Sequence, residues 1–182
     1  TNEESHYHLG NYYHKIGRYN EAIASFEQVV ALNTEFDAAY FKLGIIYNKI
    51  GRYDEGREAF ESVIRINPQA QNAYYNIGVA YTKLGRYDLA AAAYQKAIDI
   101  QPEFPEALFN LGVVNGQLGN VKDEMSAYKM AIRINPDFAP AHFAMGQAYL
   151  RQGDKTAALD QYKILRKLDN VLADKLFEKI YR

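Results

Sequence analysis

The residues best suited to chemistry lie at the amino end of the chain, where three of the four histidines stand at His6, His8 and His14. Histidines that bind one metal ion from a helix are usually about four positions apart, so that both imidazoles lie on one face. Here His8 follows His6 by two positions, His14 follows His8 by six, and the chain has no cysteine. The spacing therefore predicts no metal site.

Catalytic motifs are also missing. The sequence holds no nucleophile elbow, no phosphate-binding glycine loop and no HExxH helix. A phosphate-binding loop is rich in glycine, but ten of the chain's twelve glycines recur at fixed spacing, two in each copy of a repeat. We therefore predict that the chain is not an enzyme and binds no cofactor.

Composition narrows the class of partner. With 48% hydrophobic residues, 24% charged residues and a net charge of −1, the 182-residue chain has the composition of an ordinary soluble protein. The near-neutral charge argues against a nucleic-acid partner, and no apolar run reaches the roughly 18 residues that membrane insertion needs. Because cysteine is absent, the redox compartment is undetermined, and both cytoplasm and periplasm stay open.

Because the sequence has no catalytic or metal-binding motif, its most informative feature is an internal repeat. The sequence reads KIGRY at 15–19, KIGRY at 49–53 and KLGRY at 83–87, and the central glycine recurs twice more. The glycines of this series are Gly17, Gly51, Gly85, Gly119 and Gly153, a strict period of 34 residues. Such a period indicates a stack of identical supersecondary units.

Each copy has the pattern of two helices. In the second copy, apolar residues recur three or four positions apart on both sides of Gly51: Tyr40, Leu43 and Tyr47 before it, and Phe60, Val63 and Ile64 after it. Glycine adopts the left-handed conformation that ends a helix, and Pro68 ends the second one by displacing Asn67 from helical geometry. The unit is therefore expected to be a helical hairpin with one apolar face per helix.

A second glycine recurs inside the first helix of each copy, at Gly10, Gly44, Gly78, Gly112 and Gly146. Without a side chain it should let the two helices approach closely. We expect it to face small residues of the second helix, namely Ala22, Gly56, Ala90 and Ala158.

This pattern resembles the tetratricopeptide repeat (TPR) family, whose signature is a bulky residue, then Leu-Gly, Tyr, Ala, Phe and Pro. The third copy matches in order with Tyr74, Ile77, Gly78, Tyr81, Ala90, Tyr94 and Pro102. The resemblance implies an all-α, right-handed α-solenoid of five stacked helix-turn-helix repeats, over 3–36, 37–70, 71–104, 105–138 and 139–172. A C-terminal capping helix would follow over 173–182. Its apolar stripe, Leu176, Phe177, Ile180 and Tyr181, should cover the last repeat or support self-association.

The resemblance also implies that the first helices line a concave groove. One groove-facing row comprises Asn11, Ile45, Val79, Val113 and Gln147, and its three central members form an apolar strip. Four residues earlier stands an aromatic row of Tyr7, Phe41, Tyr75, Phe109 and Phe143, which serves either packing or ligand contact. Asn76 and Asn110 lie beside it, where an amide could hydrogen-bond a peptide backbone. Family members often carry a polar residue in the first row, so its three apolar central members favour ligand contact.

A basic row follows four residues beyond the apolar strip, with Lys15, Lys49, Lys83 and Arg151. These cations would either favour an acidic partner or complement the dipoles of the helices that they end. The two-carboxylate clamp of some TPR proteins is absent, because Tyr7 replaces its first lysine and Lys42 its second asparagine.

The fourth copy departs most from the pattern. Asn115 replaces the expected tyrosine, Glu124 replaces the expected alanine, and Gly116 has no evident role.

We predict a non-enzymatic interaction scaffold that binds a peptide or protein segment in its groove, through the apolar strip and the flanking lysines. Two alternatives remain. One is a self-assembling scaffold whose contacts come from Phe177, Ile180 and Tyr181, and the other is the targeting module of a larger enzyme.

Overall fold

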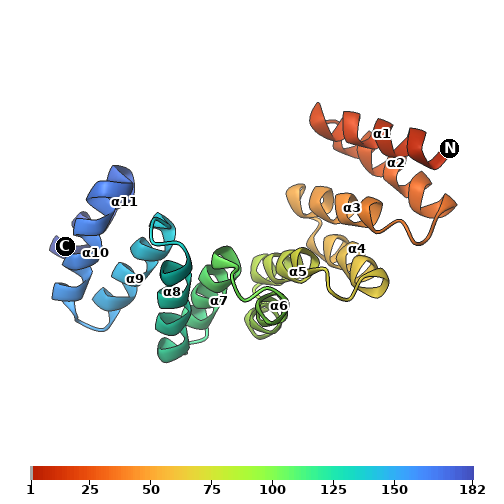
Figure 1. The fold of residues 1–182 in the computed structure, drawn as a ribbon. Helices are drawn as coiled ribbons and strands as arrows, with labels where there is room; N and C mark the ends of the chain where they lie inside the picture. Colours follow the sequence, from red (N-terminus) through yellow and green to blue (C-terminus); the bar gives the residue numbers. More distant parts are fainter. Residues whose placement is uncertain (1) are drawn as a thin grey trace. The chain divides into compact units, whose positions relative to one another are not determined.

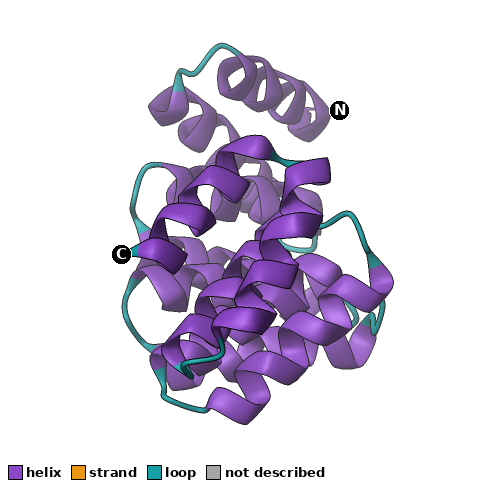
Figure 2. Cartoon of the chain, turned by 90° about the vertical axis from the view of Figure 1, so that its left-hand side faces the viewer, coloured by secondary structure: helices purple, strands orange, loops and turns teal. Residues whose placement is uncertain are grey.

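The computed structural model describes residues 2–182, which form eleven α-helices and no strand (Figure 1). The helices are α1 (Asn2–Lys15), α2 (Tyr19–Leu32), α3 (Asp37–Lys49), α4 (Tyr53–Ile66), α5 (Gln71–Lys83), α6 (Tyr87–Ile100), α7 (Pro105–Gln117), α8 (Val121–Ile134), α9 (Ala139–Arg151), α10 (Lys155–Leu168) and α11 (Asn170–Tyr181). Short loops join them (Figure 2). The all-helical repeat fold expected from the sequence is confirmed.

The chain divides into two compact units. Unit 1 ends at Ile100 and contains α1 to α6, and unit 2, Gln101–Arg182, contains α7 to α11. Within each unit, the two helices of a hairpin pack on each other, and the second helix packs on the first helix of the next hairpin. The core therefore runs along each unit as a series of helix–helix contacts.

A glycine in the left-handed region ends the first helix of every hairpin. The φ angles of the five turn glycines are 78°, 82°, 71°, 77° and 80° in chain order, and no other described residue has a positive φ. At Gly51, the next amide, that of Arg52, donates to the Tyr47 carbonyl at 2.8 Å, which satisfies a carbonyl at the end of α3. The expected helix-ending role of these glycines is confirmed.

The glycine inside each first helix faces an aromatic ring. A Cβ atom added at Gly44 would lie 2.6 Å from the Phe60 ring, and Gly10, Gly78 and Gly112 meet the corresponding rings of their own hairpins. The expectation that this glycine faces a small residue is therefore wrong, because the ring of the second helix occupies that space. In the last hairpin, Gly146 instead faces Leu176 of α11.

The core clusters join consecutive hairpins. In unit 1, Phe26 and Val29 of α2 pack with Leu43 and Ile46 of α3, and all four are 0–4% exposed. In unit 2, one cluster joins α8 to α9. A second cluster joins both α9 and α10 to α11. Burial of these apolar faces supplies most of the stability that such repeats have.

The last helix, α11, begins at Asn170, ahead of the tail expected from residue 173, because Asp169 accepts from the Leu172 amide and starts the helix early. The expected stripe is divided. Leu176 and Ile180 are buried against the last hairpin, whereas Phe177 and Tyr181 are 43% and 59% exposed.

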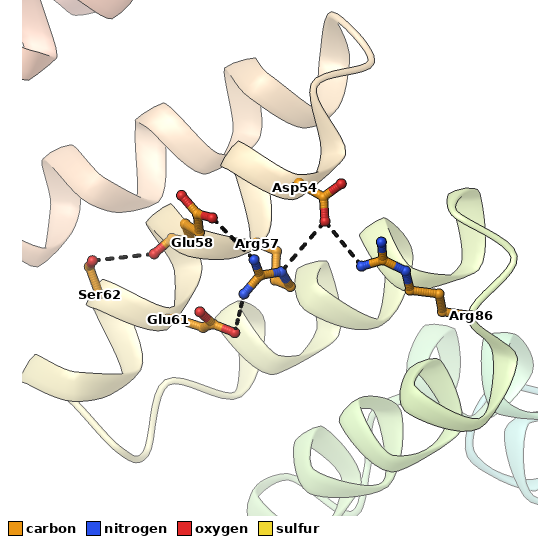
Figure 3. Close-up of polar contacts among 6 residues, drawn as sticks. All are labelled: Asp54, Arg57, Glu58, Glu61, Ser62 and Arg86. Atoms are coloured by element: carbon orange, nitrogen blue, oxygen red, sulfur yellow. Dashed lines mark hydrogen bonds and ion pairs between the residues drawn. The ribbon is translucent and has the colours of Figure 1, made fainter.

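An ion-pair network on α4 ties the second hairpin to the third (Figure 3). The Arg57 guanidinium contacts the carboxylates of Glu61 at 2.7 Å, Glu58 at 3.2 Å and Asp54 at 3.9 Å. Asp54 also contacts Arg86, in the turn before α6, at 3.1 Å.

Candidate functional site

The twelve residues expected to line the binding groove all lie on first helices, and each is half-buried. In unit 1 they are Tyr7 and Asn11 of α1, Phe41 and Ile45 of α3, and Tyr75, Asn76 and Val79 of α5. In unit 2 they are Phe109, Asn110 and Val113 of α7, and Phe143 and Gln147 of α9. None is fully buried, so each retains some surface for a ligand.

The aromatic row packs against the second helices. The distances between ring centroids are 5.6 Å for Tyr7–Phe26, 5.3 Å for Phe41–Phe60, 5.8 Å for Tyr75–Tyr94 and 6.0 Å for Phe109–Tyr128. Phe143 packs against the cluster that α10 and α11 form. These rings therefore stabilise their hairpins, and only their outer edges are open to a ligand.

The apolar strip takes part in packing as well. Ile45 contacts the cluster around Phe60, and Val113 contacts the cluster around Tyr128 and Met145. The strip is consequently less exposed than the sequence suggested. A substitution at Ile45 or Val113 will affect stability as well as binding.

Two asparagines of the expected groove, Asn11 and Asn76, donate hydrogen bonds to the backbone of their own helices. The Asn11 amide donates to the Tyr7 carbonyl at 3.1 Å, and the Asn76 amide donates to the Asn72 carbonyl at 2.7 Å. In this arrangement both amide groups already have a backbone acceptor. Because an amide NH2 group has two N–H donors, binding to a peptide backbone does not require these bonds to break.

The basic row is exposed, but its members differ in their contacts. The Lys49 ammonium lies 5.2 Å from the centre of the Tyr19 ring, and Arg151 forms an ion pair with Glu124. Lys15 and Lys83 form no ion pair within residues 2–182. They are the cations of the row most available to steer an acidic partner.

The amino-terminal histidines lie beside unit 1 residues of this site, since the rings of His8 and Tyr7 have centroids 6.4 Å apart. Burial, followed by the charges of Lys42 and Lys49, lowers the pKa of His14, which favours its neutral form. Among residues 2–182, no group of three or more histidines or carboxylates is placed to hold a metal ion.

Unit 2 brings several of the expected residues together around one pocket. Its volume is about 480 Å³, and Phe109, Val113, Phe143 and Gln147 line it together with Arg151. An adjoining hollow of about 410 Å³ shares Gln147 and Arg151 and adds Lys179 of α11. The pocket combines apolar walls with a cationic edge.

A buried carboxylate stands in this pocket. Glu124 of α8 is 3% exposed, and its Oε1 accepts from Arg151 Nη2 of α9. Room for it comes from Gly116, where an added Cβ would lie 2.7 Å from Glu124 Oε1. Burial, and then the nearby Glu124 charge, raise the pKa of Tyr128. The sequence marks Glu124 and Gly116 as departures of the fourth copy and Arg151 as a member of the basic row, but it does not show that the three lie together.

Sequence comparison decides the family. A tetratricopeptide repeat model matches residues 7–71, two further models of that description match 105–138 and 141–169, and a TPR repeat model matches 80–119 and 125–153. The chain belongs to the tetratricopeptide repeat family. No curated protein sequence matches this TPR chain.

Solved structures agree with the TPR assignment. A MamA crystal structure superposes with a TM-score of 0.85 at 25% identity, covering 91% of this chain and 97% of that chain. MamA from Desulfovibrio magneticus RS-1 gives 0.87 at 18% identity, covering 93% and 96%. YrrB, described as a TPR protein with an unusual peptide-binding site, gives 0.78 at 21% identity, covering 95% and 90%.

The TPR family and the fold support a protein–protein interaction scaffold, a class that is usually non-enzymatic. Within residues 2–182, no helix is both long enough and apolar enough to cross a bilayer.

Proposed function

We propose that this TPR chain binds a peptide or protein segment along the exposed edges of the apolar strip and the aromatic row, with the basic row favouring acidic flanks. The observation that carries the proposal is the unit 2 pocket, because Phe109, Val113, Phe143 and Gln147 line it together. These four residues are among those that the sequence predicts to face a ligand.

The size and lining of the pocket suit a peptide side chain. Ligand pockets commonly have volumes of about 300–1,000 Å³ and mostly apolar walls with a few polar groups. The unit 2 pocket, at about 480 Å³, has aromatic and aliphatic walls, and the Gln147 amide offers a partner for a peptide backbone. YrrB supplies a precedent, since the same fold there carries a peptide-binding site.

The experiment compares Val113→Lys, in the pocket, with Val121→Lys, at the exposed start of α8. Each variant and the wild type serve as bait in the native lysate, and circular dichroism and thermal melting confirm that each bait is folded. We expect a partner that the wild type and Val121→Lys retain and that folded Val113→Lys loses. Equal capture of every partner by all three baits would show that the pocket is not the binding site.

A self-assembling scaffold is the second candidate, and α11 favours it. The Phe177 and Tyr181 rings lie in contact with centroids 4.6 Å apart, and both residues are exposed. Exposed aromatic pairs of this kind suit a contact between copies. Light scattering over a concentration series separates the candidates, because a monomer at high concentration excludes self-assembly.

A further inference from the structure

The charges around the unit 2 pocket are unequally accessible. The Glu124 side chain is 3% exposed, whereas that of Arg151 is 56% exposed. A ligand entering the pocket therefore meets the guanidinium before the carboxylate. Glu124 neutralises part of this charge but is too buried to bind a ligand cation itself.

The fourth hairpin is modified to hold this carboxylate. The residues equivalent to Glu124 in three other hairpins, Ala22, Ala90 and Ala158, are fully buried, so this position has no room for a carboxylate unless a neighbour shrinks. Gly116 provides that room, because any Cβ there would overlap Glu124 Oε1. Two departures from the repeat thus cooperate to place one negative charge behind Arg151.

Arg151 is held in position but retains free donors. A guanidinium has five N–H groups in a planar fork, and a carboxylate can bind one edge in a bidentate manner. Within residues 2–182, Glu124 is the only hydrogen-bond partner of the Arg151 side chain, and it uses Nη2. The fixed orientation reduces the entropy that Arg151 loses when its other donors bind a ligand.

A second cation stands on the same side. Lys179 of α11 lines the hollow that adjoins the pocket and shares Arg151 with it. Lys179 forms no ion pair within residues 2–182. Among the residues that line the pocket and the hollow, two are cations and one is a carboxylate, which leaves a net charge of +1.

We propose that unit 2 recognises a carboxylate standing next to an apolar group. The apolar group enters the pocket between Phe109, Val113 and Phe143, and the carboxylate binds between Arg151 and Lys179. This assignment rests on the proposed function, since it names the chemistry of the segment bound there. In a peptide, the carboxylate belongs either to the C-terminus or to an Asp or Glu beside an apolar residue.

Two pairs of short peptides test the proposal and distinguish the two sources. The first pair is acetyl-Ala-Ala-Leu with a free C-terminal acid and the same peptide as its amide. The second is acetyl-Ala-Leu-Glu-amide and acetyl-Ala-Leu-Gln-amide. Each is titrated into the ¹⁵N-labelled protein, with chemical shifts followed at the amides of α7, α9 and α11. We expect at least one acid to bind about tenfold more tightly than its neutral partner, as a charge-assisted hydrogen bond allows.

Variants test which residues cause the preference for the acid peptide over its neutral partner. Lys179→Gln leaves no buried charge unpaired, so it should fold normally and reduce the preference for the acid about threefold. The double variant Glu124→Ala with Arg151→Gln restores the alanine of the other hairpins and should abolish the preference while neutral peptides still bind. Lys96→Gln, on the exposed surface of α6 and outside both the groove-facing rows and the basic row, is the matched control and should leave every affinity unchanged.

The possible outcomes distinguish failure of the carboxylate assignment from failure of the proposed peptide-binding function. If acids and neutral peptides bind equally and Val113→Lys abolishes both, the pocket binds peptides but the carboxylate assignment is wrong. If no peptide shifts the α7 and α9 amides at millimolar concentration, the pocket is not a peptide site and both proposals fail. A preference that persists in Lys179→Gln and in the double variant would also overturn the assignment.

Discussion

Glu124 and Arg151 form an ion pair between α8 and α9 in which one member is buried and the other is largely in solvent. The two residues are therefore not equivalent in their effect on stability. Removing Arg151 leaves a buried charge without a partner, whereas removing the charge of Glu124 leaves an exposed guanidinium that water can solvate.

We accordingly expect Arg151→Gln to lower the free energy of unfolding by about 3 kcal/mol. Glu124→Gln keeps the size of the side chain and loses one charged hydrogen bond, so it should cost only about 1 kcal/mol. Urea denaturation at pH 7 measures both values. Equal costs, or a larger cost for Glu124→Gln, would contradict the difference in burial.

The effect of Gly116→Ala on the free energy of unfolding should depend on the residue at position 124 and should differ in sign between Glu124 and alanine. Alanine normally stabilises a helix interior by about 1 kcal/mol relative to glycine. In the wild type its Cβ would overlap Glu124 Oε1, and moving that carboxylate aside would disturb its ion pair with Arg151. We therefore expect destabilisation in the wild type and stabilisation in the Glu124→Ala background. A double-mutant cycle of unfolding free energies measures the coupling, and additive effects would show that Gly116 has another role.

Buried tyrosines should weaken the fold in alkaline solution. Burial, and next a hydrogen bond to Glu27 at 3.1 Å, raise the pKa of Tyr47 to about 12, above its ordinary value of 10.0. Because the folded state holds this proton more tightly, the stabilisation is complete below pH 10 and is lost as the pH rises toward 12. We expect Tyr47→Phe to reduce the fall in stability between pH 9 and pH 11 by up to about 1 kcal/mol. Denaturation midpoints at the two pH values check this, with the exposed-ring variant Tyr181→Phe as the control.

The network around Arg57 should make a small, salt-dependent contribution. Its three carboxylate partners are 49–66% exposed, so screening limits each ion pair. Arg57→Met keeps most of the apolar stem and should cost about 0.5–1 kcal/mol at low ionic strength, with less in concentrated salt. Thermal melting in two salt concentrations measures the difference. Arg133→Met, on the exposed surface of α8, serves as control, and a salt-independent loss would point to packing instead.

The hairpin architecture was predictable because a repeat multiplies a weak local signal. One glycine before a helix is ambiguous, but five at a fixed period required the same turn each time, and all five have positive φ. The placement of the two expected groove rows on the first helices followed from the same period, but the apolar strip is less exposed than the sequence suggested.

Contacts between different hairpins were not predictable to the same extent. The ion pair of Glu124 and Arg151 joins α8 to α9, and no local sequence pattern predicts that these two residues are in contact. A signal did exist, since Asn115, Gly116 and Glu124 all depart from the repeat in one copy. The sequence does not say that Gly116 makes room for Glu124, because that depends on how the two helices of the hairpin are packed.

The contact between Gly146 and Leu176 has a consequence for local opening of the chain. In the other hairpins the ring that fills the glycine position comes from the same hairpin, so each can close by itself. In the last hairpin the partner is Leu176 of α11, and Tyr162 of α10 instead packs against Phe177 of α11, with ring centroids 5.3 Å apart. The amides of α9, α10 and α11 should therefore exchange with solvent deuterium as a single cooperative group, and α11 should not be released before the hairpin that it closes.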